Sequence, residues 1–255
     1  MRAMFATSLL LGMPLIASLA LGGPAASAPD TGRFVHASVR VGHESHRYAV
    51  WLPPGHDARK SWPGILFLHG SGECGTDGEK PLHIGFGPAL AAHPDRWPFV
   101  VVFPQKARED EEWEENENLV FKVLDDAIRH FAIDRTRVAL AGMSQGGHGA
   151  WMIGARHPGP WKCLVPICGY GRARTIAPRV ARLPVWAFHG LQDDLVDPAD
   201  TRRIIGWMRG QCAALGVDST QVHMTLFPDA NHDAWDPAFA HDSLNVWLKE
   251  QLEVK

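Results

Sequence analysis

The sequence has little net charge and no pattern of metal-binding residues. Lysine and arginine number 25 and aspartate and glutamate 28, which gives a formal net charge of −3 at pH 7. This balance gives no reason to expect nucleic acid or an anionic membrane surface as a partner. Cysteine and histidine occur in no Cys-x-x-Cys or similar zinc-ligand spacing. We therefore expect no metal and no cofactor.

Long apolar runs are also scarce, and the one that stands out opens the chain. Residues 1–28 join Arg2 to an apolar stretch and end in the sequence ASA at residues 26–28. A basic start, an apolar core and an A-x-A site predict a secretory signal peptide cleaved after Ala28, and hence a secreted or periplasmic protein. An uncleaved anchor is the alternative, but Pro14 and several glycines make this stretch a poor spanning helix. No later run is long enough to span a membrane.

The sequence has only four cysteines: Cys74, Cys163, Cys168 and Cys212. Export would allow disulfides among them, and three connectivities are possible. A bridge between Cys163 and Cys168 is disfavoured, because five residues of strand at roughly 3.3 Å each put them about 16 Å apart. The sequence does not choose among the remaining pairings.

The rest of the chain, residues 29–255, alternates apolar strand patterns with helical ones. The predicted strands are 33–41, 46–53, 64–70, 98–104, 138–141, 164–167, 184–190 and 221–228, and the predicted helices are 118–131, 144–157, 199–214 and 237–252. We expect the first two strands to form a hairpin near Gly42. The alternation predicts one α/β domain with a mostly parallel central sheet and helices on both faces. The segment between residues 169 and 183 is too short for a large lid domain.

A serine between two glycines is the strongest local signal. Gly142, Ser144 and Gly146 fit the pattern G-x-S-x-G, after a strand-like run and before a helical pattern. That context predicts a nucleophile elbow, in which a sharp turn exposes the serine hydroxyl. A glycine-rich turn that holds an incidental serine is the alternative.

A serine hydroxyl needs a base and a group that orients the base. The sequence "AFHGLQDDLVDP" is a strand followed at once by Asp193 and Asp194, with Asp197 a little further on. The later strand at 221–228 is followed by a loop that holds His232. The order serine, acid, histidine at strand ends favours Ser144, Asp193 and His232 as catalytic residues, with Asp194 and then Asp197 as alternative acids. An ordinary loop histidine remains the alternative for His232.

Two backbone amides should stabilise an oxyanion beside this serine. The first is the amide of Gln145, directly after the nucleophile. The second should come from the glycine-rich loop "LHGSGECG" at residues 68–75, most simply from Ser71. A plain glycine turn is the alternative for this loop.

The acidic stretch at residues 108–118 is interpreted as a solvated loop that runs into a helix N-terminus, where negative charge is favourable. A calcium loop is the alternative, although the spacing matches no EF-hand. Trp113 in this stretch and Trp235 beside His232 fall at the same predicted edge of the sheet. Either tryptophan could line a substrate pocket.

The motifs "LHGSGECG", "FPQ", "GMSQGGHGAW", "PICGYG", "WAFHGLQDDLV" and "NHDAW" together resemble a known family. They are similar to the secreted α/β-hydrolase esterases related to the prolyl oligopeptidase catalytic domain, and to phospholipase/carboxylesterase, dienelactone hydrolase and feruloyl esterase or polyhydroxyalkanoate depolymerase-like proteins. The resemblance runs from about Arg33 to the C-terminus. It implies Ser144 as the nucleophile, His232 as the base and Asp193 as the acid. The proline that usually follows the valine of the acid motif is replaced by Asp197, which keeps Asp194 open.

These features predict a serine hydrolase that cleaves carboxylic esters through an acyl-enzyme intermediate. The expected substrates are small-molecule esters or accessible polymer ends. The resemblance also allows a serine peptidase of the prolyl oligopeptidase type, although the chain offers no room for a gating domain. A binding module without activity on the same scaffold is the third alternative.

Overall fold

The computed structural model describes residues 31–254. The predicted signal peptide and its cleavage site lie outside the described residues, so its prediction stays untested. Within residues 31–254, no helix combines the length and the apolar character that a membrane crossing requires.

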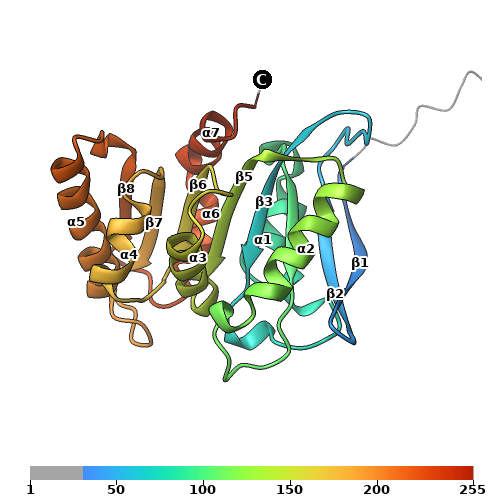
Figure 1. The fold of residues 1–255 in the computed structure, drawn as a ribbon, viewed down its shortest axis with the longest axis horizontal. Coiled ribbons are helices and arrows are strands. Elements are labelled where there is room, and N and C mark those ends of the chain that lie inside the picture. Colours follow the sequence, from blue (N-terminus) through green and yellow to red (C-terminus); the bar gives the residue numbers. More distant parts are fainter. Residues whose placement is uncertain (1–30, 255) are drawn as a thin grey trace, which may run out of the picture.

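One eight-stranded sheet forms the centre of the described chain, in the order β1-β2-β4-β3-β5-β6-β7-β8 (Figure 1). Strands β1 and β2 form an antiparallel hairpin, β2 pairs antiparallel with β4, and all later neighbours are parallel. The strands are β1 (Arg33–Val41), β2 (Glu44–Leu52), β3 (Trp62–Leu68), β4 (Val100–Pro104), β5 (Ile133–Met143), β6 (Cys163–Ile167), β7 (Val185–Gly190) and β8 (Val222–Phe227). The predicted hairpin turns at Gly42, whose φ of 62° favours glycine. The predicted mostly parallel sheet is confirmed.

Helices cover both faces of the sheet. They are α1 (Phe86–Ala92), α2 (Glu117–His130), α3 (Gln145–Arg156), α4 (Ala173–Val180), α5 (Pro198–Leu215), α6 (Trp235–Ala240) and α7 (Asp242–Gln251). Figure 1 shows α2, α3, α4 and α5 on one face and α1, α6 and α7 on the other. Two separate apolar clusters, one on each side, match this division. The central strands are buried on both faces, which explains why they read as continuous apolar runs.

Several elements differ from the prediction, and α1 was not predicted at all, because its seven residues are too few to show a helical period. Strand β5 begins at Ile133 instead of residue 138, because Ile133 pairs with Trp62 ahead of a polar stretch. Helix α4 was not predicted, since Pro178 lies inside it and masks the helical pattern. The predicted last helix is divided into α6 and α7 at His241, whose ψ of 116° is not helical.

Helix α4 occupies the segment where a lid could have been inserted. It packs beside α3 and α5 on one face of the sheet. The expectation of no large lid domain therefore agrees with the described residues. The four cysteines are all free thiols in the structure, and no pairing among them is formed.

Candidate active site

Ser144 lies on the sharp turn between β5 and α3. Its φ of 54° and ψ of −120° form a backbone conformation that non-glycine residues rarely adopt. The strand before the turn and the helix after it pass very closely, and this is possible because Gly142 and Gly146 have no side chain. A Cβ atom on Gly142 would lie 2.2 Å from the carbonyl oxygen of Gly146, and one on Gly146 would lie 2.0 Å from that of Leu68. The G-x-S-x-G pattern therefore has the strand–turn–helix geometry predicted from the sequence.

The structure brings His232 and Asp193 to this serine. His232 Nε2 lies 2.8 Å from Ser144 Oγ, and His232 Nδ1 lies 2.8 Å from Asp193 Oδ2. A carboxylate can only accept, so Nδ1 carries the proton and Nε2 is free to accept the serine proton. The three side chains come from the ends of β5, β7 and β8, which meet at the carboxyl edge of the parallel sheet.

Asp193 and Asp194 are adjacent in sequence but lie in different surroundings. Asp193 is buried, and its Oδ1 accepts the backbone N–H groups of Leu195 and Val196. Burial would raise the pKa of Asp193, but hydrogen bonds from Val196, His232 and Leu195 outweigh it and hold the pKa below its usual range. Asp194 is exposed to solvent, and Asp197 caps α5 by accepting the N–H of Ala199 at 2.8 Å. Of the three candidates, only Asp193 contacts the imidazole.

A second histidine supports Asp193, and no sequence motif indicates this contact. His189 is fully buried, and its Nε2 lies 3.0 Å from the carbonyl oxygen of Val196 and 3.1 Å from Asp193 Oδ2. Its Nδ1 lies 2.8 Å from the hydroxyl of Thr201. Because a carbonyl cannot donate, Nε2 carries the proton, and Nδ1 accepts from Thr201. Burial lowers the pKa of His189, which keeps the ring neutral. Cys168 completes this buried group, within 4.8 Å of His189 and Asp193.

Buried polar side chains hydrogen-bond the loop at residues 68–75, which is predicted to supply an oxyanion amide. His69 Nδ1 donates to the carbonyl of Gly70 at 2.6 Å, and His69 Nε2 accepts the N–H of Lys106 at 3.2 Å. Gln105, from the "FPQ" motif, donates to the carbonyl of Glu73 at 2.9 Å. Ser71 begins the short 3-10 helix of this loop and lies in the wall of the cavity at Ser144. The loop is therefore fixed in place, as a preorganised amide donor requires.

Gln145 begins α3 directly after the serine. Its side chain is buried and donates to the carbonyls of Glu109 and Glu111, at 3.0 and 3.2 Å. These bonds fasten the acidic stretch at residues 108–118 to the start of α3. Its backbone amide lies at the open N-terminal end of the helix, where no intrahelical acceptor is available.

Trp113 does not lie where a pocket residue should. Its side chain has no exposed surface, donates to the carbonyl of His69 at 3.0 Å and covers Gly149 of α3. The expectation that Trp113 lines a substrate pocket is therefore corrected: it packs between the acidic stretch and α3. The interpretation of that stretch as a solvated loop is also only partly right, since residues 107–110 are exposed but Trp113 is in the core.

The cavity at Ser144 has a volume of about 310 Å³. Its walls include Ile84, Met143, Leu195 and Trp235, so the space beside the serine is mainly apolar. Leu195 is 74% exposed at its rim, which leaves the cavity open to solvent. Trp235 also packs edge-on against His232, with 5.5 Å between ring centroids. The structure thus places Trp235, but not Trp113, in the candidate pocket.

Glu73 is the one carboxyl group in this cavity wall among the described residues. It is 7% exposed, and burial raises its pKa. Backbone amides of the same loop oppose this effect by donating to the carboxylate. A carboxyl group beside an apolar space can bind a polar group of a substrate, since it accepts a hydrogen bond as a carboxylate and donates one when it is protonated.

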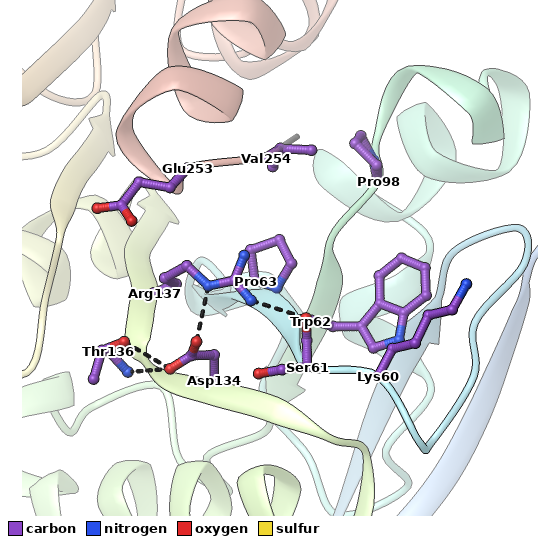
Figure 2. A pocket seen from close by; sticks show the side chains of 10 residues that line it. All are labelled: Lys60, Ser61, Trp62, Pro63, Pro98, Asp134, Thr136, Arg137, Glu253 and Val254. Carbon is purple, nitrogen blue, oxygen red and sulfur yellow. Dashed lines mark hydrogen bonds and ion pairs between the residues drawn. The ribbon is translucent and has the colours of Figure 1, made fainter.

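A larger cavity of about 580 Å³ lies away from Ser144 (Figure 2). It is lined by Trp62 and Asp134 near the starts of β3 and β5, and by Glu253 after α7. Ser144 follows the opposite, carboxyl end of β5. Arg137 in this cavity is already bound by Asp134 and by the carbonyl of Ser61. Thr136 donates its hydroxyl to Asp134 at 2.7 Å in this cavity. Hydrogen bonds from Thr136 and Arg137 lower the pKa of Asp134 to about 2, which makes this carboxylate a poor base, so size alone does not make the cavity a candidate active site.

No protein-family model and no curated protein matches the sequence. Solved structures do match the fold. A thermostable esterase superimposes with a TM-score of 0.70 at 22% identity over 85% of this chain, which spans 62% of the esterase chain. The feruloyl esterase module from Clostridium thermocellum, complexed with sinapinate, gives 0.65 at 17% identity over 87% of this chain and 88% of its own. An acylaminoacyl peptidase gives 0.64 at 14% identity over 86% of this chain and 41% of its own.

The sheet order, the helices on both faces and these neighbours establish one conclusion. The chain has the α/β-hydrolase fold, as the sequence predicted. At these identities the comparisons show the fold alone, because one fold can carry unrelated activities.

Proposed function

We propose that the protein is a serine hydrolase that cleaves carboxylic esters through an acyl-enzyme. The observation that carries the proposal is the chain of two 2.8 Å contacts from Asp193 through His232 to Ser144, on an elbow that exposes the serine hydroxyl. A hydroxyl, a neutral imidazole and a buried carboxylate in this order are what nucleophilic catalysis by serine requires.

Each side chain has a defined part in the proposed reaction. Ser144 Oγ attacks the ester carbonyl while His232 Nε2 takes its proton, and Asp193 stabilises the imidazolium that forms. The amides of Gln145 and Ser71 hold the oxyanion of the tetrahedral intermediate. The carbon–oxygen bond to the alcohol then breaks, and His232 returns the proton to the leaving alkoxide. A water molecule, activated by the same histidine, hydrolyses the acyl-serine and releases the carboxylic acid.

The cavity favours esters with a compact apolar acyl or alcohol group. Apolar side chains surround the serine, and the open rim at Leu195 admits either a small molecule or the end of a polymer. Esterase names among the structural neighbours support this choice of reaction.

A serine peptidase is the second candidate, because an acylaminoacyl peptidase shares the fold. The chain spans 41% of that peptidase, and the described residues form a single sheet with its helices. An amide leaving group is harder to expel than an alkoxide, so the two candidates separate on matched substrates.

The test combines active-site labelling with a substrate panel. We expect an organophosphate to label Ser144 at one equivalent per chain, and Ser144→Ala and His232→Ala each to abolish most turnover while circular dichroism is unchanged. The panel contains p-nitrophenyl esters, feruloyl esters, hydroxyalkanoate oligomers and peptide amides. Preferential turnover of amides would favour the peptidase, whereas failure of both labelling and turnover would leave a binding module.

We further propose that the protein is exported, because the sequence opens with a basic residue, an apolar stretch and an A-x-A site. N-terminal sequencing of material from the periplasm or the medium should begin at Pro29. An intact N-terminus in the membrane fraction would contradict cleavage.

A further inference from the structure

Two carboxylates and an imidazole meet on the side of α3 that faces the acidic stretch. Glu112 and Glu114 belong to the acidic stretch at residues 108–118, and His148 lies one turn into α3 after Ser144. One potential ligand atom from each lies within 4.8 Å of the others. None of these residues takes part in the proposed ester hydrolysis.

The tautomer of His148 is fixed by the backbone. Its Nδ1 lies 2.9 Å from the carbonyl oxygen of Tyr170, and a carbonyl can only accept, so Nδ1 carries a proton. Its Nε2 then lies 3.1 Å from Glu114 Oε1. In a neutral imidazole the lone pair of Nε2 would face a lone pair of Glu114 Oε1, which is repulsive. A positive charge between the two atoms would remove this repulsion. A second proton on the ring or a bound cation can supply it.

The carboxylates also have free coordinating capacity. Tyr170 donates its hydroxyl to Glu112 Oε1 at 2.7 Å and stacks its ring on His148. The other oxygen of each carboxylate, Oε2 of Glu112 and Oε2 of Glu114, is inaccessible to solvent and has no hydrogen-bond partner. A buried carboxylate oxygen without a partner costs free energy, and a cation between the two would remove that cost.

We propose that Glu112, Glu114 and His148 form a binding site for a divalent transition-metal cation, with Zn²⁺ as the best-fitting member of the class. An imidazole nitrogen with two carboxylates suits Zn²⁺ better than Ca²⁺ or Mg²⁺, which prefer oxygen ligands alone. Ligands about 2.1 Å from a tetrahedral zinc ion are about 3.4 Å apart, close to the 3.1 Å between His148 Nε2 and Glu114 Oε1. Glu112 supplies the third ligand, since its nearest carboxylate oxygen lies within 4.8 Å of the other two ligand atoms, and water completes the coordination.

The surroundings have the form of a metal site's outer shell. A metal-ligating histidine usually donates its other N–H to a carbonyl or carboxylate, as His148 does to Tyr170. The Tyr170 hydroxyl orients Glu112 in the same way. The ion would join the acidic stretch to α3, so its first effect is on stability and not on the reaction at Ser144.

The neighbouring pair of Glu117 and His157 provides a matched control. His157 Nε2 lies 3.1 Å from Glu117 Oε2, the same separation as in the proposed site. That pair is more exposed, and its carboxylate also binds Arg156. It belongs to no group of three metal-binding side chains among residues 31–254. A histidine–glutamate contact alone should therefore bind zinc poorly.

The experiment measures zinc binding directly. Protein freed of metal with EDTA, and then of EDTA, is titrated with ZnCl₂ by calorimetry at pH 7.5 as wild type, Glu114→Gln, His148→Gln and His157→Gln. We expect His157→Gln to keep the tightest wild-type binding event, and the two cluster variants to weaken it at least tenfold. Zinc should raise the melting temperature of wild type and His157→Gln, but not of the cluster variants. Equal tight binding in all four proteins would overturn the proposal.

If Glu114→Gln or His148→Gln fails to fold, X-ray diffraction from the wild-type protein tests whether zinc binds at this site. Wild-type crystals soaked in ZnCl₂ are measured at the zinc absorption edge. An anomalous peak between His148 Nε2 and Glu114, at about 2.1 Å from each, is the expected result. Peaks at other histidines with none at this position would refute the site, and zinc would then act on the protein elsewhere.

Discussion

The Nε2 atom of His189 lies 3.1 Å from Oδ2 of Asp193, the same oxygen that His232 contacts at 2.8 Å. Backbone amides of Leu195 and Val196 hold the other oxygen, Oδ1. The carboxylate is therefore fixed on all sides before any substrate binds. Such preorganisation means that the acid needs no rearrangement when the imidazolium forms.

The first prediction concerns the two adjacent aspartates. Asp193→Asn should lower kcat by roughly 10⁴-fold, because an amide donor facing Nδ1 favours the wrong imidazole tautomer. Asp194→Asn should lower it by no more than about tenfold, since Asp194 is exposed and acts only through the loop. Both kcat values are measured on the same p-nitrophenyl ester, with circular dichroism as the folding control. An inactive Asp194→Asn beside an active Asp193→Asn would move the acid by one residue.

The second prediction assigns His189 a positioning role. His189→Phe fills the same buried space but removes the N–H that lies between the Val196 carbonyl and Asp193, so kcat should fall by about 10- to 100-fold as the carboxylate loses its fixed position. His189→Gln can place an amide N–H near the same point and should recover most of the lost kcat. KM should change little in either variant, because His189 lies outside the cavity wall.

A loss of kcat that is equal in both variants would indicate that the N–H of His189 does not position Asp193. Melting temperatures separate this outcome from simple destabilisation. Both variants must melt well above the assay temperature for the comparison to count.

The third prediction concerns the close approach behind the elbow. A methyl group on Gly146 would lie 2.0 Å from the carbonyl oxygen of Leu68, which is backbone and cannot rotate away. Gly146→Ala should therefore cost about 3 kcal/mol or more of unfolding free energy, or prevent folding. Gly206→Ala on exposed α5 meets nothing within 4 Å and should stabilise the protein by up to about 1 kcal/mol. Denaturant unfolding of the two variants against wild type measures both, and similar stabilities would contradict the crowded turn.

Ser144, Asp193 and His232 could be brought together from sequence because each follows an apolar strand of a parallel sheet. The carboxyl ends of such strands meet at one edge, so chain order and strand ends placed residues 39 and 88 positions apart without coordinates. The elbow is local, since it needs only two glycines at fixed spacing. That is why these parts of the fold and the site were predictable.

Contacts between distant loops could not be predicted in the same way. Trp113 lies among acidic residues, and only the packing against Gly149 shows that it is buried. His148 looked like an ordinary helical histidine, and its contact with Glu114 spans 34 residues of chain. His189 sits inside a strand, where nothing marks the side that faces Asp193. These residues depend on how loops fold over the sheet edge, which no periodicity records.

The last prediction concerns His69 and the loss of stability at acid pH. His69 is fully buried, and burial lowers its pKa to about 3. In the unfolded chain a histidine titrates near about 6.5. Between about pH 6.5 and about pH 3 the histidine binds a proton in the unfolded state but not in the folded state. The unfolding free energy is therefore unaffected by this group above about pH 6.5 and decreases as the pH falls towards about 3. One pKa unit corresponds to about 1.4 kcal/mol, so this group alone predicts a loss on the order of 5 kcal/mol by pH 3.

Replacement of His69 tests this prediction, because it should change how steeply the unfolding free energy depends on pH and not only its value near pH 7. In His69→Asn the side chain can still donate to the carbonyl of Gly70, but the N–H of Lys106 loses its acceptor. We expect the variant to be less stable near pH 7, by about 1–3 kcal/mol, and its unfolding free energy to fall less steeply between pH 6.5 and 3. His43→Asn, in the exposed turn between β1 and β2, is the matched control and should keep the wild-type slope. Urea unfolding at half-unit pH steps measures all three proteins. Parallel curves for wild type and His69→Asn would mean that another group, not the buried imidazole beneath the oxyanion loop, sets the acid sensitivity of the fold.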